Sequence, residues 1–271
     1  MSKWFAIVLA GAFCVAPAAR AGVTVAVAGN TATADIELAG VEAELILTFD
    51  DATNLSAQSL GISAETVSLD DVALLARLPP GGLASLPSAL PLLITVEPPA
   101  LGGLSLRNTV RAEIHTHALP YAAGSSFRLF KAPLNGAFRD ITDEVAPGSV
   151  RTRGTTGGFS QFLVLVDLRA TASVIDEKLA TLRSRLLALP ATERTPLEAQ
   201  LTAAEQALDE ARYADAIAVL DAFRARVSAR AGSLIPNAWT PTSRDGNVAG
   251  DLLAGAASLK FSAGYLRDYG S

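Results

Sequence analysis

Hydrophobic and polar residues alternate through the first part of the chain. Apolar side chains occupy every second position in Val23–Val27, Ala32–Leu38 and Val41–Phe49. The turn-forming pairs Gly29-Asn30 and Ala39-Gly40 separate these runs. A period of two with short polar turns is typical of antiparallel strands that bury one face. We therefore predict an antiparallel meander here.

Later short runs continue this strand-like pattern. We predict strands at Thr66–Leu69, Leu92–Val96, Thr109–Ala118, Phe127–Phe130, Val150–Arg153 and Phe162–Leu168. Within Thr109–Ala118, the alternation predicts an inward-facing side chain at Val110, Ala112, Ile114 and Ala118. In Phe162–Leu168 both the odd and the even positions are apolar, which predicts a central strand covered on both faces. Many short strands with Gly- and Pro-rich turns predict an antiparallel β-sandwich over residues 22–169.

The segment between the meander and Leu92 has no clear period. Asp70–Arg77 is compatible with one or two helical turns, and Pro79–Gly82 ends any regular element. Leu83, Leu86 and Leu90 then lie among prolines. We interpret this stretch as a loop packed on the sandwich. The alternative is an exposed apolar patch for a partner.

The period changes to that of a helix after residue 170. A capping-box pattern at Ser173–Asp176 precedes one apolar stripe, and Thr195-Pro196 opens a second. A third stripe begins at Tyr213 and a last one at Asn247, ending near Phe261. These stripes predict a small helical hairpin or bundle over residues 170–271. The predicted fold class is therefore α+β, with the sandwich first and the helices at the C-terminal end.

Two segments resemble known modules. Ser126–Lys131, Phe138–Thr142 and Gly158–Phe162 resemble the closing strands of Ig-like sandwiches in exported bacterial proteins. Ala211–Ile217, followed by Leu220, Phe223 and Val227, is similar to the helical hairpin module called FIMAH. The sequence departs from that module in the Pro236–Trp239 segment and the final helix. The resemblance implies an uncharacterised family of exported proteins and brings no enzymatic residues with it.

The N-terminal residues have the pattern of an export signal. Lys3 supplies a positive start, Trp4–Val15 is apolar but short for a membrane span, and Ala19-Arg20-Ala21 places small residues before a cleavage point. We expect a signal peptide over residues 1–21 and a secreted or periplasmic protein. The alternative is a retained N-terminal anchor.

Processing of this signal is directly measurable. Mass spectrometry of protein from an exporting host should give a new N-terminus at Gly22, or within a residue or two of it. Recovery of the intact chain from Met1 in the membrane fraction would contradict the prediction. Cys14, the only cysteine, lies in the removed segment. The processed chain then has neither a disulfide nor a thiol.

The charge of the chain restricts its partners. The net charge is −5, and removal of Lys3 and Arg20 takes it to −7. A negative chain without a basic segment argues against general nucleic-acid binding. No later apolar run is long enough to predict a membrane span after signal cleavage. An envelope or extracellular protein remains a possible partner, and the oligomeric state stays open.

His115 and His117 are the two histidines, and residues i and i+2 of a strand share a face. Such a pair can bind a metal, but a zinc site needs a third protein ligand. Arg111 and Glu113 have the same parity, so we interpret the pair as exposed histidines on a polar face. A hydrolase would need one of them as its base, and no G-x-S-x-G motif is present, although Ser160 follows glycines.

Three groups of carboxylates are candidates for calcium binding or acid–base chemistry: Asp50-Asp51, Asp70-Asp71, and Asp140 with Asp143 and Glu144. Their spacing matches no calcium loop and suits helix caps and polar turns better. Gly154, Gly157 and Gly158 are interpreted as a hairpin turn, and Trp239 and Tyr213 as packing residues of the helices.

These observations predict a non-enzymatic binding or structural protein, with no catalytic residue, metal site or cofactor assigned. The alternatives are an envelope-directed hydrolase that uses His115 or His117 as base, and a calcium-dependent adhesion module. Histidines in a cleft beside a carboxylate and a hydroxyl would favour the hydrolase.

Overall fold

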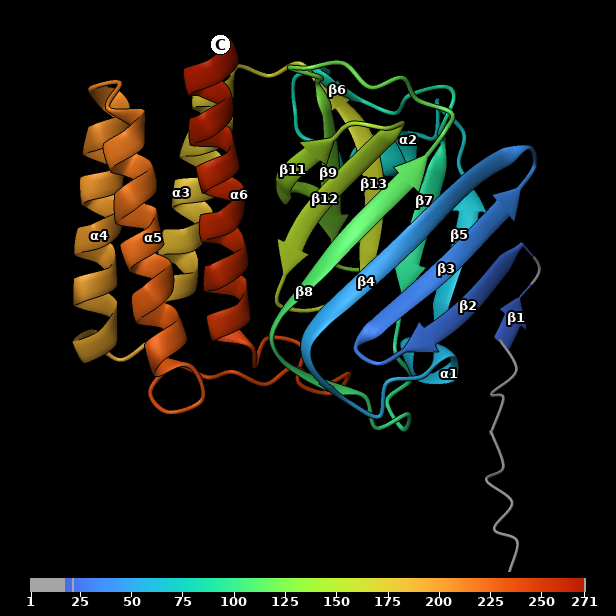
Figure 1. Cartoon of the computed structure of the whole chain (residues 1–271), viewed down its shortest axis with the longest axis horizontal. Helices are drawn as coiled ribbons and strands as arrows, with labels where there is room; N and C mark the ends of the chain where they lie inside the picture. The colour runs from blue at the N-terminus through green and yellow to red at the C-terminus, as the bar shows by residue number, and fades with distance from the viewer. Residues whose placement is uncertain (1–17, 21, 271) are drawn as a thin grey trace, which may run out of the picture.

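The computed structural model describes residues 18–20 and 22–270 and contains two antiparallel sheets (Figure 1). Sheet A has the order β1 (Ala18–Arg20), β2 (Val23–Ala28), β3 (Thr31–Leu38), β4 (Val41–Thr53), β8 (Ser105–Thr116), β12 (Val150–Thr156) and β11 (Thr142–Ala146). Sheet B has the order β10 (Arg139–Asp140), β9 (Phe127–Ala132), β13 (Gln161–Asp167), β7 (Leu92–Val96) and β5 (Ile62–Thr66), and β6 (Ala84–Ser85) also pairs with β13.

The two sheets share one hydrophobic core. Alternate residues of the meander, such as Val25, Ile36 and Leu45, are buried against Ile94 and Phe162 of sheet B. The polar residues between them lie on the outer surface of sheet A. The predicted meander is confirmed, because β2, β3 and β4 pair in sequence order with tight turns.

The second face of sheet B is covered by the segment that lacked a clear period. Leu74, Leu78 and Leu86 are buried against Phe130 and Leu165. Within this segment lies the short helix α2 (Val72–Leu75), whose first turn is capped by the Asp71 side chain. The interpretation as a packed loop is confirmed for Leu86 and Leu90 but not for Leu83, which is 49% exposed. Strand β13 is buried on both faces as predicted.

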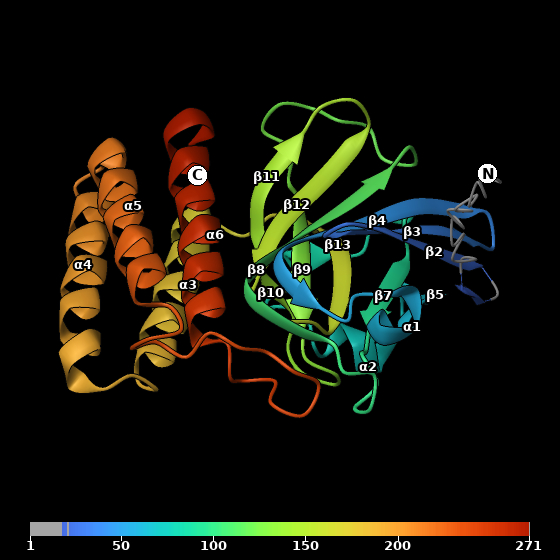
Figure 2. The ribbon, with the colours of Figure 1, turned by 60° about the horizontal axis from the view of Figure 1, so that its bottom comes forward.

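Four helices form a layer beside the sheets: α3 (Thr171–Leu186), α4 (Ala191–Asp209), α5 (Tyr213–Arg230) and α6 (Val248–Tyr269); α1 (Ala57–Leu60) is a single turn elsewhere. Helix α6 contacts β8, β11 and β12, and α4 lies farthest from the strands (Figures 1 and 2). Leu182, Leu201, Leu220 and Phe223 are buried in the core of this layer, as their spacing predicted.

The predicted helix ends needed correction. Helix α4 begins at Ala191 and contains Pro196, whereas the start was expected at Thr195-Pro196. The added turn is stabilised by buried Glu193, which pairs with Arg226 at 3.4 Å and Arg230 at 3.6 Å. These tertiary ion pairs offset the one helical hydrogen bond that a proline removes.

The ends of α3 and α6 also differ from the prediction. Helix α3 begins at Thr171 without a side-chain cap, so the box at Ser173–Asp176 does not form. Helix α6 starts as expected, with Asn247 accepting from the amide of Gly250, but it continues to Tyr269. Contacts of Tyr265 account for the extension, since its hydroxyl donates to the carbonyl of Gly124 in the turn before β9 at 2.8 Å and its ring lies against Arg128 of β9.

Trp239 belongs to the core between the sheets and not to the helical layer, contrary to the sequence interpretation. Its ring meets that of Phe159 edge to face at 5.3 Å, and its backbone bonds to Leu106 of β8. The segment between α5 and α6 therefore inserts a large side chain into the sheets. Tyr213 does pack on the helical core, as predicted.

Several strand predictions were shifted. The strand expected at Thr66–Leu69 ends at Thr66, and β8 ends before Ala118, which is exposed while Leu119 is buried. Gly157-Gly158 connects β12 of sheet A with β13 of sheet B and so forms a crossover between sheets, where a hairpin turn was predicted.

Candidate functional site

The two histidines lie at one end of a groove on the outer face of sheet A. The rings of His115 and His117 meet edge to face with centroids 4.8 Å apart. The groove has a volume of about 700 Å³. It is lined by Gly22, Val23, Thr24, Asp35, Ile36, Glu37, Glu42, Ala43, Glu44, His115, Thr116 and His117. We call this depression the acidic groove.

His115 is held between a hydroxyl and a carboxylate. Its Nε2 atom lies 3.1 Å from Ser149 Oγ, and its Nδ1 atom lies 3.6 Å from Glu44 Oε2. Its side chain is only 13% exposed, so the expectation of two exposed histidines was wrong for this one. Glu44 faces His115 directly in the β4–β8 register, and Ser149 approaches from the turn before β12.

Ser149, His115 and Glu44 are residue types that can serve as a nucleophile, a base and an orienting acid. Ser149 has a φ of +64°, a left-handed conformation in the turn after Gly148. The 3.6 Å separation between His115 Nδ1 and Glu44 is an ion-pair distance, longer than a hydrogen bond. The structure thus brings a hydroxyl and a carboxylate to His115, which is the arrangement that favours the hydrolase alternative.

Carboxylates oppose each other along the groove. Asp35 lies directly opposite Glu44, and Glu37 directly opposite Glu42, in the pairing of β3 with β4. Like charges in opposed positions destabilise a sheet. In the part of the chain that the structure describes, the one ion pair made by these four residues is that of Glu44 with His115. The groove therefore concentrates negative charge that the described residues leave largely unneutralised.

On the other half of the same face, Glu113 and Glu144 pair with arginines. Glu113 accepts from Arg151 at 2.7 Å and from Arg153, and Glu144 accepts from Arg153 at 2.7 Å and from Arg111. Burial alone raises the pKa of Glu113, but the two guanidinium groups hold it below its usual value. These two glutamates are therefore neutralised by neighbouring arginines, unlike the opposed carboxylates of the acidic groove.

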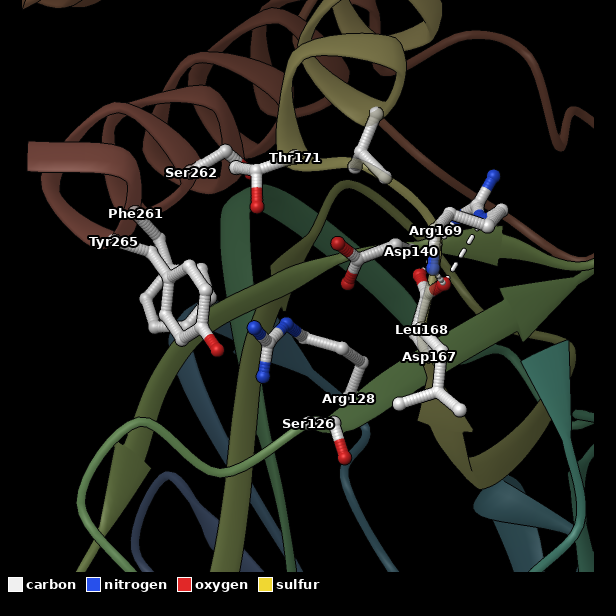
Figure 3. A pocket seen from close by; sticks show the side chains of 11 residues that line it. Ser126, Arg128, Asp140, Asp167, Leu168, Arg169, Thr171, Phe261, Ser262 and Tyr265 are labelled. Carbon is white, nitrogen blue, oxygen red and sulfur yellow. Dashed lines mark hydrogen bonds and ion pairs between the residues drawn. The ribbon is translucent and has the colours of Figure 1, made fainter. Parts of the chain in front are cut away.

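A second cavity lies where the helical layer meets the sheets (Figure 3). Its volume is about 180 Å³. It is lined by Ser126, Arg128, Asp140, Asp167, Leu168, Arg169, Thr171, Val174, Phe261, Ser262 and Tyr265. We call it the junction cavity.

The wall of the junction cavity contains a buried ion pair. Asp140 lies 2.7 Å from Lys178 Nζ, with side chains 3% and 8% exposed. The ammonium also donates to Ser262 Oγ at 2.8 Å and to the Ser258 carbonyl at 3.2 Å. Burial raises the pKa of Asp140, but the charge and hydrogen bond of Lys178 more than offset this and lower it. Burial lowers the pKa of Lys178.

Several carboxylates of the acidic turns considered for calcium already have other partners. Asp50 accepts from the amide and hydroxyl of Thr109 at 2.9 and 2.6 Å, Asp140 holds Lys178, and Asp143 accepts from Thr155. Among residues 18–20 and 22–270 no group of three or more His, Cys, Asp or Glu side chains is arranged to hold a metal ion.

Lys131 gives the junction a pH dependence. This lysine of β9 donates to Thr156 Oγ1 at 2.5 Å, and burial lowers its pKa to about 8 from 10.5, opposed by the charge of Asp251. The folded chain thus releases this proton near pH 8, while the unfolded chain keeps it until about pH 10.5. The unfolded state binds more protons between these values, so stability rises with pH across that window.

We expect this rise to be on the order of 1–2 kcal/mol, because Lys131 keeps partial contact with solvent. Urea denaturation at about pH 7 and about pH 10 measures it. In Lys131→Met the contribution should vanish, and stability at neutral pH should increase. An equal pH dependence in the variant and the parent would show that Lys131 remains hydrated and normally protonated.

Sequence reasoning missed Ser149, Glu44 and Arg128. Gly148-Ser149 is a turn signal, but nothing local places it beside His115 on another strand.

The predicted signal peptide lies mostly outside the described residues, which leave out 1–17 and 21. The described helices include none whose length and hydropathy suffice to cross a membrane.

Comparison with known proteins gives one match. No curated protein and no solved structure matches the chain. A model described as a family of unknown function, DUF6689, matches residues 6–267 and so covers nearly the whole chain. The two antiparallel sheets and the helical layer that carry the acidic groove and the junction cavity all fall within that match. The chain therefore belongs to the DUF6689 family.

Proposed function

We propose that this chain is an exported, non-enzymatic binding protein of the periplasm or extracellular space, and that the acidic groove captures a basic polypeptide segment. The observation that carries the proposal is the pair of opposed carboxylates, Asp35 with Glu44 and Glu37 with Glu42. Such pairs cost stability in the free protein, and a cationic ligand relieves that cost.

The edge of sheet A supports an extended ligand. Strand β1 pairs antiparallel with β2, from Ala18 opposite Val25 to Arg20 opposite Val23. Cleavage after Ala21 removes β1 and leaves β2 as the edge, beside the groove residues Gly22 and Thr24. An unpaired edge offers backbone donors and acceptors to an added strand. A basic segment can then pair with β2 while its charged side chains reach the carboxylates.

The architecture is part of the proposal. We assign the two sheets to an Ig-like sandwich and α4 with α5 to a FIMAH-like hairpin. In support, the sheets share one core, and α4 and α5 pack together across a short connection.

The test compares groove variants of the processed protein purified from an exporting host. Titration calorimetry with a lysine-rich extended peptide should show binding that weakens as salt rises from about 50 to about 200 mM. Asp35→Asn with Glu37→Gln should weaken it at least about tenfold, because two of the four charges are lost. The same double variant should keep or raise the melting temperature, since repulsion across β3 and β4 falls.

Glu65→Gln is the matched control. Glu65 is an exposed glutamate on β5 of sheet B, away from the groove. The Glu65→Gln substitution removes one carboxylate charge, as the groove substitutions do, and should leave the affinity for the peptide unchanged. Equal affinity of the groove variant and the parent would contradict the proposal.

The second candidate is a hydrolase in which Ser149 is the nucleophile, His115 Nε2 takes its proton and Glu44 stabilises the imidazolium. The 3.1 Å contact between Ser149 Oγ and His115 Nε2 favours it. A fluorophosphonate probe should then label Ser149, and Ser149→Ala or His115→Gln should abolish labelling. If the protein only binds, no label attaches and Ser149→Ala leaves peptide affinity unchanged. No observation favours calcium-dependent adhesion.

A further inference from the structure

Arg128 of β9 is a buried cation in the junction cavity. Its residue surface is 8% exposed. The guanidinium carbon lies 4.4 Å from the centre of the Tyr265 ring and 5.2 Å from that of Phe261. Nη1 donates to the carbonyls of Ser125 at 2.6 Å and Phe127 at 2.8 Å. In Figure 3 the guanidinium points into the cavity, toward the Tyr265 side.

Arg128 differs from the other charged residues that line this cavity, because each of those has an ion-pair partner. Asp140 is paired with Lys178, and Asp167 with Arg169 at 2.7 Å. Arg169 has a second partner in the exposed Glu177 at 2.6 Å. Within the described residues Arg128 makes no ion pair, and its Nε and Nη2 atoms have no hydrogen-bond partner. These two nitrogens are not among the fully buried side-chain atoms that lack a partner, so they are accessible from the cavity, where an anion can pair with the guanidinium.

The free donors define the ligand chemistry. Nε and one Nη of an arginine form a planar fork that matches the two oxygens of a carboxylate. The nearby carboxylates Asp140 and Asp167 repel a dianion more strongly than a monoanion, which disfavours phosphate. Phe261, Tyr265 and Val174 supply apolar walls. At about 180 Å³ the cavity resembles those that accept a benzene-sized molecule, about 150 Å³.

We propose that the junction cavity binds a small monocarboxylate, with its oxygens on the Arg128 fork and its apolar body against the aromatic side chains. The site is separate from the acidic groove and does not depend on the function proposed for it. Ser126, Thr171 and Ser262 line the same cavity and can donate hydroxyl hydrogen bonds to the carboxylate.

The test uses benzoate as the probe with the full chain. Benzoate should show saturable binding by titration calorimetry and raise the melting temperature. Benzamide has the same shape without the charge and should bind at least about tenfold more weakly. Inorganic phosphate should also bind more weakly than benzoate. Equal effects of benzoate and benzamide, or tighter binding of phosphate, would overturn the assignment.

Variants locate the site. Arg128→Lys keeps the charge but loses the fork, and should weaken benzoate binding at least about tenfold. Arg139→Gln, an exposed arginine on neighbouring β10, is the control and should bind as the parent does. If Arg128→Lys does not fold, Ser262→Val and Phe261→Leu serve as the test. Both change residues that line the same cavity, and both should weaken benzoate binding. Unchanged benzoate affinity in every folded cavity variant would place the ligand elsewhere and refute the proposal.

Discussion

Replacing Lys178 by alanine is expected to lower the free energy of unfolding by about 3–5 kcal/mol. The substitution removes the partner of Asp140, whose carboxylate is 3% exposed and lies 2.7 Å from the ammonium. An ionised carboxylate left in this place has lost its counter-charge and regains little water. Urea denaturation followed by circular dichroism measures the change.

Lys260→Ala is the matched control, because Lys260 lies on α6 and pairs with the half-exposed Asp221. Surface pairs contribute about 0–1 kcal/mol, so this variant should change little. The double variant Lys178→Met with Asp140→Leu should recover most of the loss, since it removes both buried charges. A loss below about 1 kcal/mol for Lys178→Ala would mean that the pair is hydrated.

Replacing Phe223 by alanine is the second large change, with an expected loss of about 3–5 kcal/mol. Its ring is fully buried in the core of the helical layer, among residues of all four long helices. The cost combines lost transfer free energy with the cavity that remains. Thermal or urea denaturation measures it.

Leu187→Ala serves as the control, because this apolar residue just after α3 is 69% exposed and should cost less than about 0.5 kcal/mol. A loss below about 1 kcal/mol for Phe223→Ala would contradict the burial of the ring and the register of α5. Both variants keep every charge, so their difference reports packing alone.

The elements that the sequence predicted well are those with a strong period and one buried face. Val25, Ile36 and Leu45 lie inside because a one-residue slip would expose them all. Leu201 and Leu220 lie inside because helical spacing places their stripe on one side. In each case a local pattern determines the result, and no distant partner is needed.

The errors fall where distant contacts decide. Helix α4 gains its first turn through ion pairs of Glu193 with α5, which no local signal reveals. Trp239 follows a helix in sequence but fills a space between the sheets next to Phe159. The cover over β13 comes from Leu74 and Leu78, in a segment without a period.

The candidate sites were predictable only in part. The spacing of His115 and His117 marked them, but the register that sets Glu44 opposite His115 depends on how β4 pairs with β8. Ser149 reaches the ring from a turn far along the chain. Nothing in the sequence distinguishes Arg128 from the other arginines; its position against the rings of Phe261 and Tyr265 of α6 appears only in the structure.

Amide hydrogen exchange of the processed protein, with and without the lysine-rich peptide, tests the capture of a basic segment most directly. An added strand should slow exchange along β2, Val23–Ala28, because its free amides gain partners. The same protection should be lost in the variant with Asp35→Asn and Glu37→Gln. Saturating peptide that leaves β2 exchange unchanged, or protects only residues outside the groove, would contradict the proposal.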